Sequence, residues 1–77
     1  MNPRHRVLKP REVAATLEDM GFVAVRQKGS YVQYRHPDGR QTTVPFHAGR
    51  DIAPTLLRQI VSAIGVTMDE FYGYDSD

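Results

Sequence analysis

The stretch from Phe22 to Phe46 has the sequence FVAVRQKGSYVQYRHPDGRQTTVPF and predicts a meander of three antiparallel strands. Its β-branched and aromatic residues favour extended structure over residues 22–27, 31–36 and 40–46. Pro45 has no backbone N–H to donate, so we expect the third strand to lie at an edge of the sheet or to end there.

Two loops connect these strands. Lys28-Gly29-Ser30 offers a glycine for a positive φ and predicts a three-residue hairpin loop, which would pair Gln27 with Tyr31. Pro37-Asp38-Gly39 is a strong turn sequence, because proline presets φ and glycine accepts the left-handed conformation. A three-residue loop at this turn pairs Tyr31 with Pro45.

Side chains alternate between the two faces of a strand, so this register assigns each residue to a face. One face carries Val32, Tyr34, Val44 and Phe46 and is expected to meet the helices. Tyr31 and His47 share the other, open face at one end of the hairpin. Three cations are expected near that end, namely Lys28, Arg26 and Arg50.

Helices are predicted before and after the meander. The first begins at Pro10 and ends before Gly21, and the second begins near Pro54 and ends before Gly65, because apolar residues recur every three or four positions within each. A capping box predicts a short third helix over residues 68–72. The predicted fold is therefore α+β, in the order α-β-β-β-α, with a three-stranded antiparallel sheet and helices on one face, as in the double-stranded-RNA-binding domain.

Length and composition predict a single domain over residues 1–77, with a flexible arm at 1–9 and a flexible tail at 73–77. The absence of cysteine excludes disulfides and thiolate zinc sites, and no apolar run resembles a signal peptide or a membrane span. We therefore expect a cytoplasmic protein that does not contact membranes.

The net charge of +1 divides into +5 over residues 1–50 and −4 over residues 51–77. A basic half can contact phosphates, although chance asymmetry on a solvated surface is an equal alternative.

One end of the predicted sheet carries groups that can act on RNA, namely Tyr31, His47 and the nearby cations. Metal-free RNA cleavage needs a base near the 2′-hydroxyl, cations for the phosphate and an acid for the leaving oxygen. A histidine side chain has an ordinary pKa of about 6.5 and can be the base, whereas a tyrosine, with a pKa of about 10, is only about 0.1% ionised at pH 7. His47 is thus the better titrating candidate, unless it only caps a backbone carbonyl. Tyr31 can stack on a base or donate a hydrogen bond.

Other chemistries have less support in the sequence. His36, His47 and Asp51 lack the spacing of metal ligands, so neither a metal nor another cofactor is expected. Ser30, His47 and Asp51 could form a triad on paper, but nothing around Ser30 resembles a nucleophile elbow. His36 precedes a turn on the helix-facing side of its strand, which predicts a structural role.

An ordered set of short motifs resembles the HicA family over most of the chain, from the first helix to about Phe71. The motifs are Gly21-Phe22, Arg26-Gln27-Lys28-Gly29-Ser30, Arg35-His36-Pro37-Asp38-Gly39, Val44-Pro45-Phe46-His47 and Leu57-Arg58-Gln59-Ile60. The resemblance implies the toxin of a type II toxin–antitoxin pair, a metal-independent endoribonuclease that cleaves mRNA and so inhibits translation and growth. It also implies a hetero-oligomer with a HicB-type antitoxin that covers the active site.

The resemblance also assigns roles to residues. Gly29 and Ser30 correspond to the loop that presents the catalytic side chain, and His47 is a second motif position. Where the family carries its catalytic histidine, this chain has Tyr31. The predicted site therefore has Tyr31 and His47 as catalytic positions, with RNA contacts from Lys28, Gly29, Ser30, Arg26, Arg35 and Arg50.

We therefore expect a HicA-like toxin that is weakened or inactive because of Tyr31. One alternative is a non-catalytic RNA-binding or antitoxin-binding module of the same fold. Another is an adaptor whose open sheet face binds only protein. Cleavage of single-stranded RNA without added metal distinguishes the toxin from the non-catalytic module and the adaptor. RNA binding that falls steeply with salt argues against the adaptor.

Overall fold

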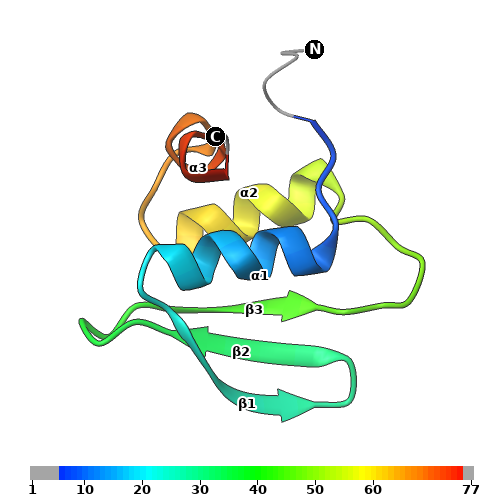
Figure 1. Ribbon diagram of the computed structural model, residues 1–77, viewed down its shortest axis with the longest axis horizontal. Coiled ribbons are helices and arrows are strands. Elements are labelled where there is room, and N and C mark those ends of the chain that lie inside the picture. The colour runs from blue at the N-terminus through cyan, green and yellow to red at the C-terminus, as the bar shows by residue number, and fades with distance from the viewer. Residues whose placement is uncertain (1–5, 76–77) are drawn as a thin grey trace.

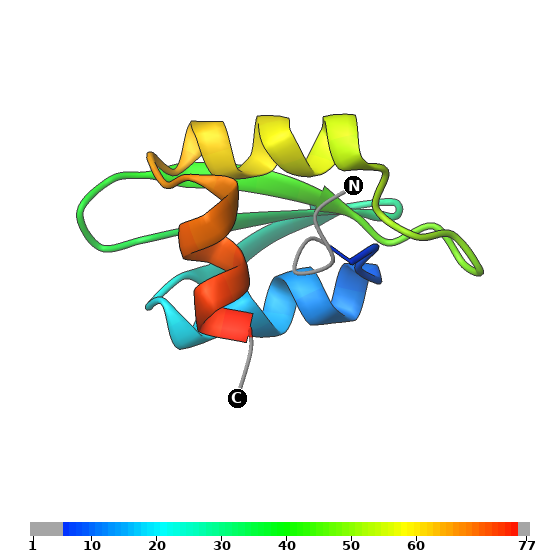
Figure 2. The same cartoon turned by 90° about the horizontal axis from the view of Figure 1, so that it is seen from above.

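A computed structural model describes residues 6–75 of the chain. Its elements are α1 (Pro10–Asp19), β1 (Val23–Lys28), β2 (Tyr31–Arg35), β3 (Gln41–Pro45), α2 (Pro54–Ala63) and α3 (Met68–Asp75). The sheet is antiparallel with the strand order β1-β2-β3 (Figure 1). α1 and α2 lie on the same face of the sheet, and α3 crosses their ends (Figure 2). This arrangement confirms the α+β architecture predicted from the sequence.

α1 begins and ends where the sequence predicts. Pro10 occupies the first turn, where its missing N–H costs no hydrogen bond. The Glu12 carboxylate accepts a hydrogen bond from the backbone N–H of Lys9 at 2.8 Å, and this bond lowers the pKa of Glu12. The helix stops before Gly21, which adopts a φ of +100° that side-chain-bearing residues rarely take.

The register of β2 against β3 is the predicted one. Tyr31 pairs with Pro45, and the backbone N–H of His36 donates to the carbonyl of Arg40 at 2.8 Å, which closes the Pro37-Asp38-Gly39 loop. β3 is an edge strand that ends at Pro45, as its missing N–H predicts.

The first hairpin differs from the prediction by one residue near its loop. Its loop has two residues, Gly29-Ser30, and Lys28 rather than Gln27 pairs with Tyr31. Gly29 supports this tight loop with a φ of +59°. Because directly paired residues point to the same face, the correction moves Lys28 onto the open face beside Tyr31.

A β-bulge confines this register change to the end of β1. The pairing shifts between Ala24 and Arg26, so Val25 is the extra residue, and Ala24 again pairs with Tyr34 as the predicted register requires. All six residues of β1 are exposed, so no buried face of that strand fixes its register.

The core lies between the helices and the inner face of β2 and β3. Its fully buried large side chains include Leu8, Leu17, Phe22, Val44, Leu57, Ile60, Ile64 and Phe71. Tyr34 is buried and Phe46 is partly buried against the same cluster, as their strand positions predict. Within residues 6–75, no helix combines the length and apolar character that crossing a membrane requires.

The segments predicted as a flexible arm and tail, 1–9 and 73–77, lie partly outside the described residues. In the described part, Leu8 is fully buried, and its carbonyl accepts a hydrogen bond from the Ile52 N–H at 2.8 Å. This bridge ties the chain before α1 to the chain before α2. The predicted capping box of α3 is present, and the helix continues past residue 72 to Asp75.

Candidate functional site

Tyr31 and His47 meet at one end of the sheet, as the strand register predicts. Tyr31 is the first residue of β2 and pairs with Pro45, and His47 follows Pro45 by two residues. The two rings make an edge-to-face contact, with 5.4 Å between centroids and an interplanar angle of 89°. Tyr31 is 52% exposed and His47 is also exposed, so both rings can reach a ligand.

The hairpin loop holds His47 through a second contact. Ser30 Oγ lies 3.1 Å from His47 Nδ1, and the two atoms share a hydrogen bond whose donor depends on the tautomer of the imidazole. The Phe46 N–H donates to the Ser30 carbonyl, which joins the two loop segments. Asp51 does not complete a triad, since its carboxylate lies 3.5 Å from Lys9 Nζ instead.

A cationic hollow borders His47. It has a volume of about 220 Å³, and its lining includes His47 and three basic residues, Lys9, Arg11 and Arg50. Lys9 and Arg11 were not among the residues predicted for the site, because they lie far from His47 in the sequence. The Leu8–Ile52 bridge brings the start of α1 beside the loop that follows β3. The Lys9-Pro10-Arg11 sequence offers no local sign of this contact.

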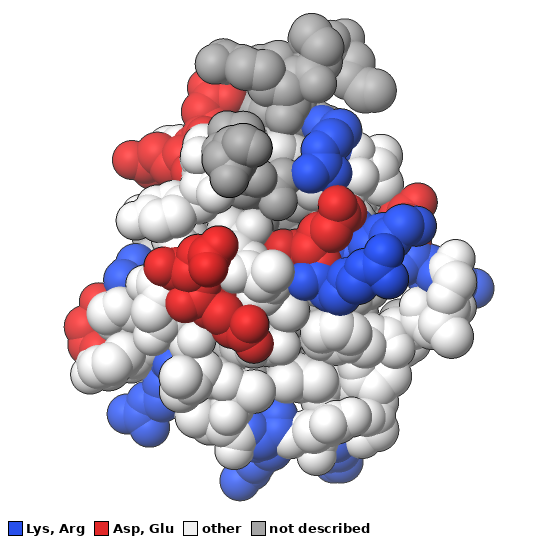
Figure 3. All heavy atoms as spheres, in the orientation of Figure 1, with Lys and Arg blue, Asp and Glu red and all other residues white. Residues whose placement is uncertain are grey.

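The other predicted cations spread along the open face. Lys28 is directly opposite Tyr31, and Arg26 is opposite Gln33, which shares the face of Tyr31. Arg35 is at the other end of β2, four residues from Tyr31, so the structure does not bring it to His47. Figure 3 shows Lys and Arg side chains along the lower edge, where β1 runs, and on the right, where α1 begins.

Among residues 6–75, no group of three or more His, Cys, Asp or Glu side chains could hold a metal ion.

Residues 10–66, from the start of α1 to just beyond α2, match the family described as the HicA toxin of bacterial toxin–antitoxin. The match includes both hairpins and the segments that carry Tyr31 and His47. The chain belongs to the HicA toxin family. No curated protein sequence matches this HicA chain. Membership in a toxin–antitoxin family implies an antitoxin partner.

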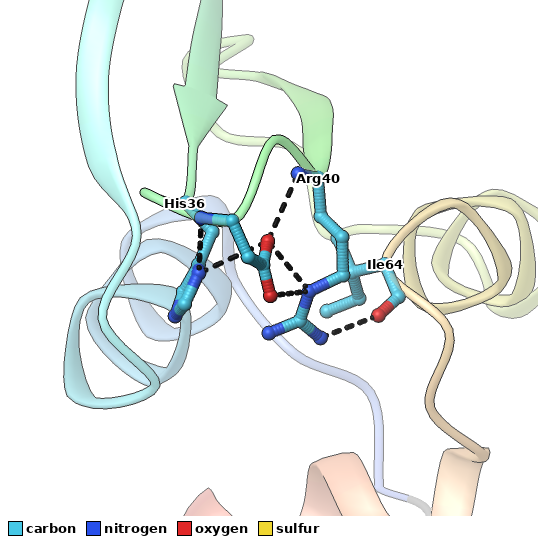
Figure 4. Close-up of polar contacts among 4 residues, drawn as sticks. His36, Arg40 and Ile64 are labelled. Atoms are coloured by element: carbon cyan, nitrogen blue, oxygen red, sulfur yellow. Dashed lines mark hydrogen bonds and ion pairs between the residues drawn. The ribbon is translucent and has the colours of Figure 1, made fainter.

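In this HicA chain, the turn between β2 and β3 serves the fold. The Arg40 Nε–H group donates to both carboxylate oxygens of Asp38, at 3.1 and 2.9 Å, and Nη1 donates to the Ile64 carbonyl at the end of α2, at 2.8 Å (Figure 4). The Arg40 guanidinium also lies 5.3 Å from the centre of the Phe22 ring. Hydrogen bonds from Arg40, first from its backbone N–H, lower the pKa of Asp38. These contacts clamp the turn to α2 and to the chain after α1.

His36 belongs to this clamp. Its Nδ1 lies 3.1 Å from the backbone nitrogen of Asp38, and its ring meets Phe22 edge-on, with 5.1 Å between centroids. A Cβ atom at Gly21 would lie 3.0 Å from His36 Nε2, so a side chain there would press on the His36 ring, and the φ of +100° independently favours glycine. His36 follows the end of β2 opposite to Tyr31, and its contacts support the structural role predicted for it.

Proposed function

We propose that this HicA chain is the toxin of a HicAB pair, with an RNA-cleaving site that keeps its binding groups but lacks its base. The observation that carries the proposal is the contact between Tyr31 and His47 beside a hollow lined by three cations. Tyr31 occupies the position at which the family resemblance implies the catalytic histidine. A tyrosine hydroxyl is almost entirely protonated at neutral pH, so it is a weak base for a 2′-hydroxyl.

The proposed chemistry is proton transfer around one phosphodiester. A base takes the proton of the 2′-hydroxyl, whose oxygen attacks the adjacent phosphorus. The bond from phosphorus to the 5′-oxygen breaks, and an acid gives that oxygen a proton. His47 can supply one of these two roles, and Ser30 fixes the plane of its ring. The missing group is the base, because a phenol is a poor base for a 2′-hydroxyl at neutral pH.

The cations supply the remaining requirement. Arg11, Arg50 and Lys9 line the hollow beside His47, where they can stabilise the charge that builds on the phosphate during attack. Lys28 adds a positive charge on the other side of Tyr31. The same positive surface suits a HicB-type antitoxin with acidic groups, which would block mRNA in a cytoplasmic complex.

A direct test uses the purified chain with labelled single-stranded RNA and a chelator, from pH 6 to pH 10. We expect binding at low salt with no measurable cleavage near neutrality, and any activity to rise toward alkaline pH, where a phenol ionises. Cleavage that already reaches a plateau at neutral pH and disappears in His47→Ala would show that His47 is a sufficient base. That result would contradict the proposed loss of function.

A non-catalytic RNA-binding role is the second candidate, and Tyr31 itself favours it. An exposed aromatic ring on an open sheet face can stack on a base without chemistry. In the same assay, this role gives RNA binding with no cleavage at any pH.

A further inference from the structure

A second hollow also borders His47. It lies between β3 and α2 and has a volume of about 430 Å³, within the range of small-molecule sites. We name it the β3–α2 groove; its lining includes Tyr31, Thr43, Pro45, His47, Leu56 and Gln59. Tyr31 and His47 therefore belong both to the candidate site and to this groove.

The chemistry of the β3–α2 groove is unlike that of the cationic hollow. No Lys, Arg, Asp or Glu lines it. Its apolar surface comes from Pro45, which is buried, Leu56, which is half-buried, and Ile60, which is 2% exposed. The exposed side chains of Thr43 and Gln59 add a hydroxyl and an amide, and among the described residues neither is hydrogen-bonded to another side chain or to the backbone.

These features define the ligand by its chemistry. A charged phosphate is favoured in the cationic hollow, whereas a groove with apolar surface and no Lys, Arg, Asp or Glu favours a neutral group. A free amide and a free hydroxyl at the edge of such a groove fit a ligand whose own edge carries donors and acceptors. A nucleobase has this combination of apolar faces and a hydrogen-bonding edge.

We propose that the β3–α2 groove binds one unpaired nucleobase of the RNA. This inference rests on the proposed function, since the base belongs to the RNA whose phosphate lies in the cationic hollow. His47 lines both hollows, so a phosphate and a neighbouring base can be bound on either side of it. Tyr31 is placed to stack on the base, and the Gln59 amide is placed at its hydrogen-bonding edge.

An apolar side chain of a protein partner is the competing occupant. It would fill the space beside Leu56 and Ile60 but would offer no hydrogen bond to the Gln59 amide or the Thr43 hydroxyl, both of which are exposed. A base satisfies these groups and explains why the groove adjoins the phosphate-binding cations.

The test measures binding of short single-stranded RNAs in low salt to the full chain. The RNAs carry 2′-O-methyl groups, so they cannot be cleaved, and each has one abasic position. We expect one abasic position to weaken binding on the order of tenfold, the usual effect of losing one stacked base, and the others to have little effect. Gln59→Ala and Leu56→Ala should each reduce that penalty by about threefold or more, because groups in contact are coupled.

Gln41→Ala is the matched control, since Gln41 is an exposed glutamine of β3 that does not line the groove. Gln59 is exposed on a helix, so its replacement by alanine keeps the fold even if Leu56→Ala lowers stability. An abasic penalty that is the same in Gln59→Ala, Leu56→Ala and Gln41→Ala overturns the base site and leaves the RNA-binding function standing. A chain that binds none of the intact RNAs overturns the proposed function together with the base site. Loss of antitoxin binding in Gln59→Ala and Leu56→Ala, with unchanged RNA binding, assigns the groove to a protein side chain and also overturns the proposal.

Discussion

Replacing Arg50 by alanine should weaken RNA binding and lower its dependence on salt. Arg50 lines the cationic hollow beside His47 and is exposed. Each cation that neutralises a phosphate of single-stranded RNA contributes about −0.7 to the slope of log affinity against log salt. The hollow has three cations, and Lys28 opposite Tyr31 is a fourth.

With three to four phosphate contacts, the expected slope is about −2 to −3. Affinity should then fall by about 20- to 50-fold between 50 and 200 mM salt. Because Lys9 already lies 3.5 Å from Asp51, its contribution is reduced, and the lower end of this range is expected. Arg50→Ala should bring the slope closer to zero by about 0.7.

Fluorescence anisotropy of a labelled single-stranded RNA at several salt concentrations measures this slope. Arg35→Ala is the matched control, since it removes the same charge from the far end of β2. We expect Arg35→Ala to change the slope less than Arg50→Ala does. A larger effect from Arg35→Ala would refute the reasoning, because it would place the RNA along the open sheet face instead of across its end.

Three further predictions concern the supports of the fold and of the site. Arg40→Met should lower the free energy of unfolding by about 2 kcal/mol, because it removes the hydrogen bond to the Ile64 carbonyl and the contact with Phe22. Arg40→Lys should recover less than half of this loss. Urea denaturation measures both variants, and equal stability of Arg40→Lys and the parent chain would contradict the role of these contacts. The Lys9 N–H lowers the pKa of Glu12 in the fold, so Glu12→Gln should reduce the free energy of unfolding at pH 7. This difference from the parent chain should shrink as pH falls below 4.5, the ordinary pKa, and through the lower pKa of the folded state. A difference that stays constant across this acid range would contradict a role for the ionised carboxylate. Ser30→Ala removes the hydrogen bond that orients the His47 ring. In a chain made active by Tyr31→His, it should lower the single-turnover cleavage rate by about tenfold and leave RNA affinity unchanged. An equal loss of affinity would mean that Ser30 contacts the RNA instead.

The sequence predicted the second hairpin well because its turn and its burial pattern agree. Pro37-Asp38-Gly39 allows few loop conformations, and the alternation of Tyr34 and Val44 with exposed residues fixes which face meets the core. The meeting of Tyr31 and His47 followed from that register alone.

The first hairpin was harder because both faces of β1 are exposed. β1 has no buried side chain whose burial would favour a two-residue loop over a three-residue loop. The bulge at Val25 then cancels the one-residue shift in register, so Ala24 pairs as predicted. Sequence therefore placed Gln27 opposite Tyr31, and the structure places Lys28 there. The correction puts a cation where the proposed RNA site needs one.

The cationic hollow could not be predicted because it is made by tertiary contacts. Lys9 and Arg11 lie near His47 because a backbone bridge joins the buried residues Leu8 and Ile52. Nothing in the sequence around Lys9 specifies this bridge. The clamp around Arg40 was missed for the same reason, since its partner at Ile64 is 24 residues away.

The central claim is that this HicA chain has kept its RNA site and lost its base at Tyr31. Cleavage of single-stranded RNA at pH 7 in the presence of a chelator, compared between the parent chain and Tyr31→His, tests it most directly. Tyr31→Phe is the control for the ring, and His47→Ala in the Tyr31→His chain tests the second group. We predict that Tyr31→His restores cleavage by at least about a hundredfold, the usual contribution of a positioned base, and that Tyr31→Phe does not. A Tyr31→His chain that binds RNA with the parent's affinity and remains as inert as the parent would contradict the claim.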